Sequence, residues 1–121
     1  MIRLYHFTCS HAAPLIRQGG RLRAFAQPQL DGRKLIWLTD LEVPTRAQLG
    51  LTSHLLRCDR MEYRVTVEVD ADRWVSYARA AFGSAKARRR AVDLGRAPGA
   101  LPMHWWVTDV EAPVLLVERA R

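Results

Sequence analysis

The chain has 121 residues, which is a typical length for one domain. Its hydrophobic share of 49% and its charged share of 26% are ordinary for a globular protein and exclude intrinsic disorder. The apolar runs are too short to span a membrane, and the start of the chain does not have the pattern of a secretory signal. We therefore expect a single domain over residues 1–121, located in the cytoplasm.

The net charge is strongly positive and is carried almost wholly by arginine. Nineteen Lys and Arg residues stand against twelve Asp and Glu residues, which gives +7, and only Lys34 and Lys86 are lysines. A guanidinium group binds phosphate in a planar, two-pronged geometry, so the excess favours a nucleic acid or a nucleotide as partner. The alternative is a solvated surface with no bound partner.

The two cysteines, Cys9 and Cys58, lie 49 positions apart and do not form a disulfide framework. Cys9 stands between His6 and His11, and His and Cys both ligate zinc. The segment has no CxxC spacing, so we expect no metal site.

The patterning of apolar residues predicts short elements throughout the first half of the chain. In order, these are a strand over Ile2–Phe7, a helix over His11–Gln18 that ends at Gly19-Gly20, a strand over Arg21–Phe25, a loop over Ala26–Arg33, a strand over Leu35–Thr39 and a helical turn within Thr45–Leu51. The strand over Leu35–Thr39 is almost wholly apolar, as expected of a strand covered on both faces.

The second half begins with a clear alternation over Tyr63–Val69, which predicts a half-buried strand. Residues 72–81 have an ambiguous pattern. The remaining predictions are a helix over Ala80–Leu94, a loop over Arg96–Pro102, and two closing strands over His104–Thr108 and Pro113–Glu118. Together these elements predict an α+β fold with about five or six short strands and two or three helices.

The first predicted strand carries the clearest chemical signal. A histidine at a strand end can hydrogen-bond ribose hydroxyls through its ring, and His6 has Thr8 beside it as a second polar group. The alternative is that His6 is a structural histidine and Thr8 is a plain helix cap.

This opening resembles the ADP-ribosyltransferase superfamily, and most closely its small, DarT-like branch. The likeness rests on Leu4–Thr8, on the turn at Gly19-Gly20 and on the strand over Leu35–Thr39, so it covers residues 2–40. It implies an ADP-ribosyltransferase-like pair of split β-sheets flanked by two or three short helices, with NAD bound between the sheets. It also implies that His6 and Thr8 bind ribose, and that Trp37 or Thr39 flanks the nicotinamide.

Many members of that superfamily hold the nicotinamide ribose with a glutamate on a late strand, because positive charge develops at the anomeric carbon. Here the late strand begins at His104 without an acidic residue, and Glu118 lies near the end of the last strand. The resemblance therefore implies His6, Thr39, His104 and Glu118 as the catalytic candidates. An ordinary surface carboxylate is the alternative for Glu118.

A second polar cluster precedes the alternating strand. Arg57 and Arg60 suit a pyrophosphate, Ser53 suits a hydroxyl contact, and Tyr63 follows them at the strand start. The alternative is a helix over Leu51–Cys58 whose arginines are solvated.

Two further features suit a nucleic acid. The basic residues Lys86, Arg88, Arg89 and Arg90 share one predicted helix and are expected to contact phosphates. Adjacent side chains on a strand face opposite sides, so one of Trp105 and Trp106 enters the core and the other lies in a pocket or at the surface. We take the second as Trp105, which would offer a stacking platform if exposed. A solvated helix and two buried tryptophans are the alternatives.

These features lead to an expected function. The resemblance implies an NAD-dependent ADP-ribosyltransferase that uses NAD as a substrate and modifies a nucleic-acid base, as toxins, phage proteins and defence effectors do. The alternative is a non-catalytic, Arg-rich nucleic-acid-binding module.

Overall fold

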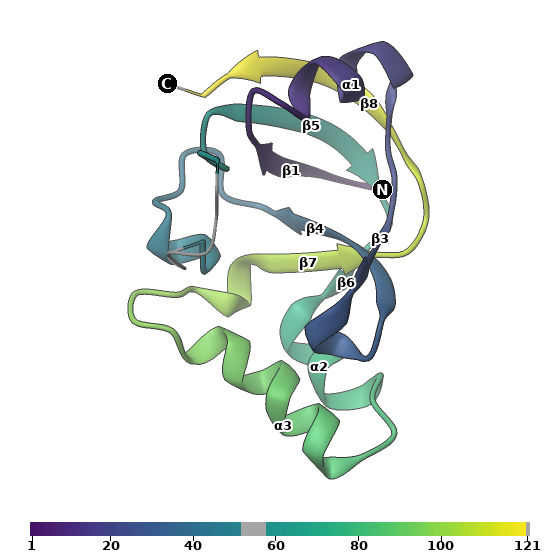
Figure 1. Ribbon diagram of the computed structural model, residues 1–121, viewed down its shortest axis with the longest axis vertical. Coiled ribbons are helices and arrows are strands. Elements are labelled where there is room, and N and C mark those ends of the chain that lie inside the picture. Colours follow the sequence, from purple (N-terminus) through teal and green to yellow (C-terminus); the bar gives the residue numbers. More distant parts are fainter. Residues whose placement is uncertain (52–57, 121) are drawn as a thin grey trace.

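The computed structural model of the chain describes residues 1–51 and 58–120 (Figure 1). Within those residues the fold is α+β, as expected, and combines eight strands with three α-helices and short 3-10 turns. The strands are β1 (Ile2–Thr8), β2 (Arg21–Leu22), β3 (Phe25–Gln27), β4 (Arg33–Thr39), β5 (Tyr63–Val69), β6 (Asp72–Arg73), β7 (Trp105–Thr108) and β8 (Ala112–Arg119). The helices are α1 (Ala13–Gly19), α2 (Trp74–Ala80) and α3 (Ala85–Asp93), and the 3-10 turns are η1 (Pro28–Leu30), η2 (Ala47–Leu49), η3 (Leu94–Arg96) and η4 (Pro102–His104).

The strands form one open, mostly antiparallel sheet in the order β2-β8-β5-β1-β4-β7-β6, with β3 beside β4. Its two halves are joined weakly. β1 pairs with β5 along its whole length, whereas the described pairing of β1 with β4 is confined to Tyr5 and Thr39. The sheet is therefore nearly divided between β1 and β4, which lie in the middle of the molecule (Figure 1).

Two large hydrophobic cores pack against the sheet. One core gathers side chains of β1, β5 and β8, including Leu4, Val65 and Val67, with Ile16 of α1 packed against it. The other lies between the sheet and the helices α2 and α3 and is centred on Trp74, which is 1% exposed. Figure 1 shows α1 beside β8 and α2 with α3 beyond β7.

Strands β4 and β7 contribute to both cores, which explains the unbroken apolar run in β4. Ile36 and Leu38 pack into the first core and Leu35 into the second, because successive side chains of a strand point to opposite faces. The prediction of a strand covered on both faces is confirmed at Leu35–Thr39.

The predicted helix over Ala80–Leu94 is wrong in its extent. α2 ends at Ala80, and α3 begins only at Ala85, after Gly83. The Ser84 hydroxyl accepts a hydrogen bond from Ala87 N at 3.1 Å and so caps a new helix start. The helix pattern across the break is real, but it belongs to two helices with a turn between them.

The region between Arg21 and Arg33 also differs from the prediction. The expected strand over Arg21–Phe25 is two pieces, because β2 pairs with β8 whereas β3 pairs with β4. The expected loop over Ala26–Arg33 contains most of β3 and the turn η1. β2 and β3 each form by pairing with a strand from a distant part of the chain, so the local sequence pattern does not reveal them.

Among the described helices, none has the length and apolar character needed to cross a membrane.

Candidate functional site

A cleft with a volume of about 410 Å³ opens where β1 and β4 meet. Its walls carry the aromatic side chains Tyr5, Phe7, Trp37 and Trp105 and the polar side chains His6, Gln27, Gln29, Thr39 and Arg60. Leu38 of β4, the leucines of η2 and η3 and the segment Gly50-Leu51 complete the lining. Among the described lining residues, Arg60 is the one that carries a formal charge. The aromatic walls and this positive charge suit a flat, partly apolar ligand that has an anionic group.

His6 is held in one protonation state by its neighbours. Its Nδ1 lies 2.8 Å from the carbonyl oxygen of Trp37. A carbonyl only accepts, so Nδ1 carries the proton and donates it. Burial lowers the pKa of His6, and the positive charge of Arg60 lowers that pKa further, against the hydrogen bond to Trp37. His6 is therefore neutral at pH 7, so its other ring nitrogen, Nε2, can accept a hydrogen bond from a hydroxyl group.

Trp37 is the half-buried member of an aromatic wall. Its ring centroid lies 4.6 Å from that of Trp74 and 6.0 Å from that of Trp105, with the Trp105 ring edge-on at 87°. Trp105 Nε1 donates to Gln48 O at 2.8 Å. A Cβ at Gly50 would lie 3.1 Å from Trp105, so a side chain there would crowd the ring. The wall is thus rigid behind Trp37, whose exposed part faces the cleft.

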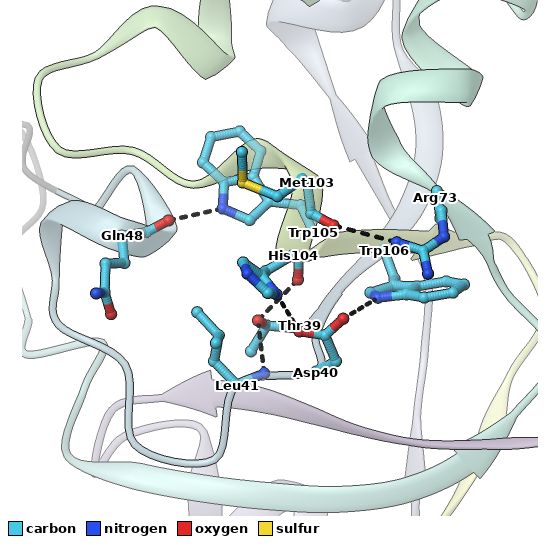
Figure 2. Close-up of polar contacts among 9 residues, drawn as sticks. All are labelled: Thr39, Asp40, Leu41, Gln48, Arg73, Met103, His104, Trp105 and Trp106. Carbon is cyan, nitrogen blue, oxygen red and sulfur yellow. Dashed lines mark hydrogen bonds and ion pairs between the residues drawn. The ribbon is translucent and has the colours of Figure 1, made fainter.

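Thr39 lines the cleft, but its hydroxyl is engaged in hydrogen bonds within the fold. Its side chain is 2% exposed, and Oγ1 donates to the His104 carbonyl oxygen at 2.8 Å while accepting from Leu41 N at 3.1 Å. These bonds tie the end of β4 to the start of β7 (Figure 2).

His104 belongs to a cluster outside the cleft lining. Its Nδ1 lies 2.7 Å from Asp40 Oδ1, and Trp106 Nε1 donates to Asp40 Oδ2 at 3.1 Å. Figure 2 shows the Asp40 carboxylate between the two rings, and the Arg73 guanidinium lies over the Trp106 ring at 4.6 Å. Because side chains alternate along β7, Trp105 reaches the cleft while Trp106 turns to the opposite core.

Glu118 is likewise absent from the described cleft lining. It pairs with Arg64 across β5 and β8, and Arg64 Nη1 donates to Glu42 O at 2.8 Å. The same guanidinium lies 5.1 Å from the centre of the Tyr5 ring, on the cleft wall. Glu118 therefore holds an arginine that packs behind the wall.

Glu42 is a carboxylate that the sequence did not single out. Burial raises the pKa of Tyr5, and the Glu42 charge and a hydrogen bond from the Tyr5 hydroxyl to Glu42 raise it further. Glu42 thus contacts a side chain of the cleft wall. It lies between β4 and η2, and no local pattern in the sequence marks it.

The other predicted cofactor contacts are scattered. Thr8 and Tyr63 face each other in the pairing of β1 with β5, Thr8 is 5% exposed, and Arg119 lies over the Tyr63 ring at 5.7 Å. Neither is part of the described cleft lining. Ser53 and Arg57 lie outside the described residues. The predicted site residues that the structure brings together in the cleft are His6, Trp37, Thr39, Arg60 and Trp105.

A second, basic groove lies between α2 and α3. It has a volume of about 490 Å³, and its charged lining residues are Arg79, Arg88, Arg89, Asp93 and Arg96. Arg96 pairs with Asp93 at 3.2 Å. The sequence identified Arg88 and Arg89 but missed Arg79 and Arg96, which come from α2 and η3 and join the groove only through folding.

The other two basic residues predicted on this helix, Lys86 and Arg90, are not part of the groove lining. Arg90 pairs with Asp31 at 3.7 Å, and Lys86 is exposed outside the groove lining. Trp105 lies in the lining of the cleft, as expected for the tryptophan that does not enter the first core, but it offers no exposed platform, since Trp105 is 5% exposed and Trp106 is 8% exposed. Both are buried because the two cores cover both faces of β7.

Within the described part of the chain, no group of three His, Cys, Asp or Glu side chains could hold a metal ion. Comparison of the chain with protein-family models, curated proteins and solved structures gave no match.

Proposed function

We propose that the protein is an NAD-dependent ADP-ribosyltransferase whose NAD lies in the cleft between β1 and β4. The observation that carries the proposal is the fixed acceptor on His6, which stands in one cleft with an aromatic wall and an arginine. We assign the nearly divided sheet to the split-sheet fold of that superfamily.

Each part of NAD has a matching group. A ribose hydroxyl donates to Nε2 of neutral His6, and the nicotinamide ring packs on the half-buried Trp37. The pyrophosphate takes a charge-assisted hydrogen bond from the exposed Arg60. These three side chains lie on β1, on β4 and just before β5, so the ligand spans the junction of the two half-sheets.

In the reaction, the bond from ribose C1 to the nicotinamide nitrogen breaks, and the acceptor forms a bond to C1 and loses its proton. Positive charge develops on the ribose, so a nearby carboxylate stabilises the transition state. The described cleft lining contains no Asp or Glu. We assign this role to Glu42, acting behind Tyr5, and treat Glu118 and His104 as residues that position the walls.

The acceptor we propose is a nucleic acid. The basic groove meets the cleft at η3, because Leu94 lines the cleft and Arg96 lines the groove. A phosphodiester strand in the groove would therefore pass beside the cleft. NAD and nucleic acids are both present in the cytoplasm, where we place the protein. The same groove supports the second candidate function, a nucleic-acid-binding module without catalysis.

Titration of NAD by calorimetry tests the proposal. We expect His6→Ala to weaken binding by about tenfold, the value of one lost hydrogen bond. The matched control is His11→Ala, which removes an exposed imidazole from the loop after β1 and should leave NAD affinity unchanged. Absence of NAD binding, together with nucleic-acid binding that weakens steeply with salt, would favour the second candidate.

A further inference from the structure

The half-buried side chains of Arg46 and Asp59 form an ion pair that links two segments of the cleft wall. Arg46 Nη2 lies 2.8 Å from Asp59 Oδ1. Arg46 directly precedes the turn η2, and Asp59 directly precedes Arg60. Neither side chain belongs to the described cleft lining, so the pair can affect a ligand only through the residues that it holds in place.

Asp59 fixes the backbone at Arg60. The oxygen that binds Arg46 also accepts a hydrogen bond from Met61 N at 2.9 Å, and this contact from the second residue onward closes an Asx turn around Arg60. Met61 is 3% exposed and packs against Tyr5, on the cleft wall. Arg60 therefore lies between two anchored neighbours, although its own side chain is exposed.

Arg46 holds the other segment through its backbone. Its carbonyl oxygen accepts hydrogen bonds from Leu49 N at 3.3 Å and from Leu51 N at 3.0 Å, and both leucines line the cleft. The same residue thus binds the leucine segment with its carbonyl group and Asp59 with its guanidinium. The ion pair therefore fixes where Arg60 lies relative to the leucine wall.

We propose that Arg46 and Asp59 are positioning residues that hold Arg60 where its guanidinium binds the pyrophosphate of a dinucleotide. This role rests on the proposed function, which assigns the pyrophosphate to Arg60. An arginine loses rotamer freedom when it binds an anion, and a backbone that is already fixed reduces this cost of binding. A partly exposed ion pair stabilises a fold only slightly, so the main effect of this pair is on ligand affinity.

Calorimetric titration of ADP-ribose into Asp59→Ala and Arg46→Ala tests this role. The two substitutions change the net charge in opposite directions, so a general electrostatic effect would strengthen anion binding in Asp59→Ala and weaken it in Arg46→Ala. Loss of positioning instead weakens binding in both variants, by about fivefold. Arg46→Lys keeps a cation beside Asp59 and should retain most of the affinity. In an Arg60→Ala background neither alanine substitution should have a further effect, because the positioned group is absent.

The matched control is the ion pair between Arg3 and Glu68, which lie 3.1 Å apart on β1 and β5 and outside the described cleft lining. Arg3→Ala and Glu68→Ala should change the affinity for ADP-ribose by less than about twofold, and in opposite directions. Nicotinamide riboside, which has no phosphate, should bind equally to the wild type and to every variant.

Opposite effects of Asp59→Ala and Arg46→Ala on ADP-ribose would overturn the positioning role. Equal losses for ADP-ribose and nicotinamide riboside would also overturn it, because they would show a general disturbance of the cleft. Either result leaves the proposed function intact, provided that the wild type binds ADP-ribose. A folded wild type that binds no ADP-ribose would refute the proposed function and, with it, the role of the pair.

Discussion

The imidazole of His6 reaches from β1 to β4, where its Nδ1 donates to the carbonyl oxygen of Trp37 at 2.8 Å. This bond lies next to the Tyr5–Thr39 pair, the described backbone pairing of the two strands. His6 thus helps to close the sheet and, with the same ring, leaves Nε2 as an acceptor in the cleft. Replacing His6 should therefore change both the stability of the protein and its affinity for the ligand. The pH dependence of unfolding and a comparison of His6→Gln with His6→Ala separate these two effects.

The stability of the protein should depend on pH through His6. Because burial lowers its pKa, the unfolded chain binds more protons at this residue than the folded chain once the pH falls below about 6.5. The stabilisation is complete above that pH and is lost as the pH falls through the lowered pKa. Urea unfolding between pH 7 and pH 5 should show this, with His6 contributing a slope of at most about 1.4 kcal/mol per pH unit.

The matched variant is His6→Gln, whose amide can still donate to Trp37 O but does not titrate. Its stability should fall less steeply between pH 7 and pH 5 than that of the wild type. Identical slopes for the two proteins would mean that His6 is not held neutral by the fold.

Arg60→Ala should weaken binding of NAD and of ADP-ribose by about tenfold, because a charge-assisted hydrogen bond to the pyrophosphate is lost. Binding of nicotinamide riboside, which has no phosphate, should not change. The control is Arg23→Ala, an exposed arginine whose Nε lies 3.7 Å from Glu111, away from the cleft lining. Calorimetric titration measures both, and equal loss for the three ligands would contradict the pyrophosphate contact.

Asp40→Ala should destabilise the fold without affecting NAD. It leaves the ring nitrogens of His104 and Trp106 without their carboxylate partner, at a cost of about 1–3 kcal/mol. The thermal midpoint should fall by about 10 °C, whereas Asp109→Ala, in an exposed turn, should leave it unchanged. A variant that folds well but loses nicotinamide release would instead place the His104 cluster in catalysis.

Arg89→Glu should weaken nucleic-acid binding by about tenfold and reduce the salt slope by about one. Lys86→Glu makes the same change in charge on the same helix but outside the groove, so its effect should be only about twofold. Fluorescence anisotropy with a labelled strand at several salt concentrations compares them. Equal effects of the two substitutions would show that the nucleic acid responds to the overall charge of the protein rather than binding in the groove.

Several elements were predictable because their signals are local. The alternation over Tyr63–Val69 predicts β5 with its observed bounds, and the apolar run over Leu35–Thr39 predicts the strand shared by both cores. The break at Gly83 was missed because alanine-rich spacing continues on both sides of it.

The candidate site was only half predictable for a physical reason. His6 and Trp37 could be named because each stands on a strand with a recognisable pattern. The contact of Tyr5 with Glu42 arises from how segments pack, and no spacing in the sequence marks it. His104 ends the turn η4 and contacts Asp40, whereas Trp105 begins β7 and lines the cleft, although the two are neighbours in the chain.

The measurement that tests the central claim most directly is release of nicotinamide from NAD, followed by chromatography in the presence of DNA or RNA. The wild type should release nicotinamide and add an ADP-ribosyl mass to the nucleic acid. His6→Ala should reduce the rate of nicotinamide release at least about tenfold, which corresponds to the loss of one hydrogen bond to a hydroxyl, while His11→Ala retains the wild-type rate. No release by the folded wild type with any nucleic acid, or full release by His6→Ala, would contradict the account.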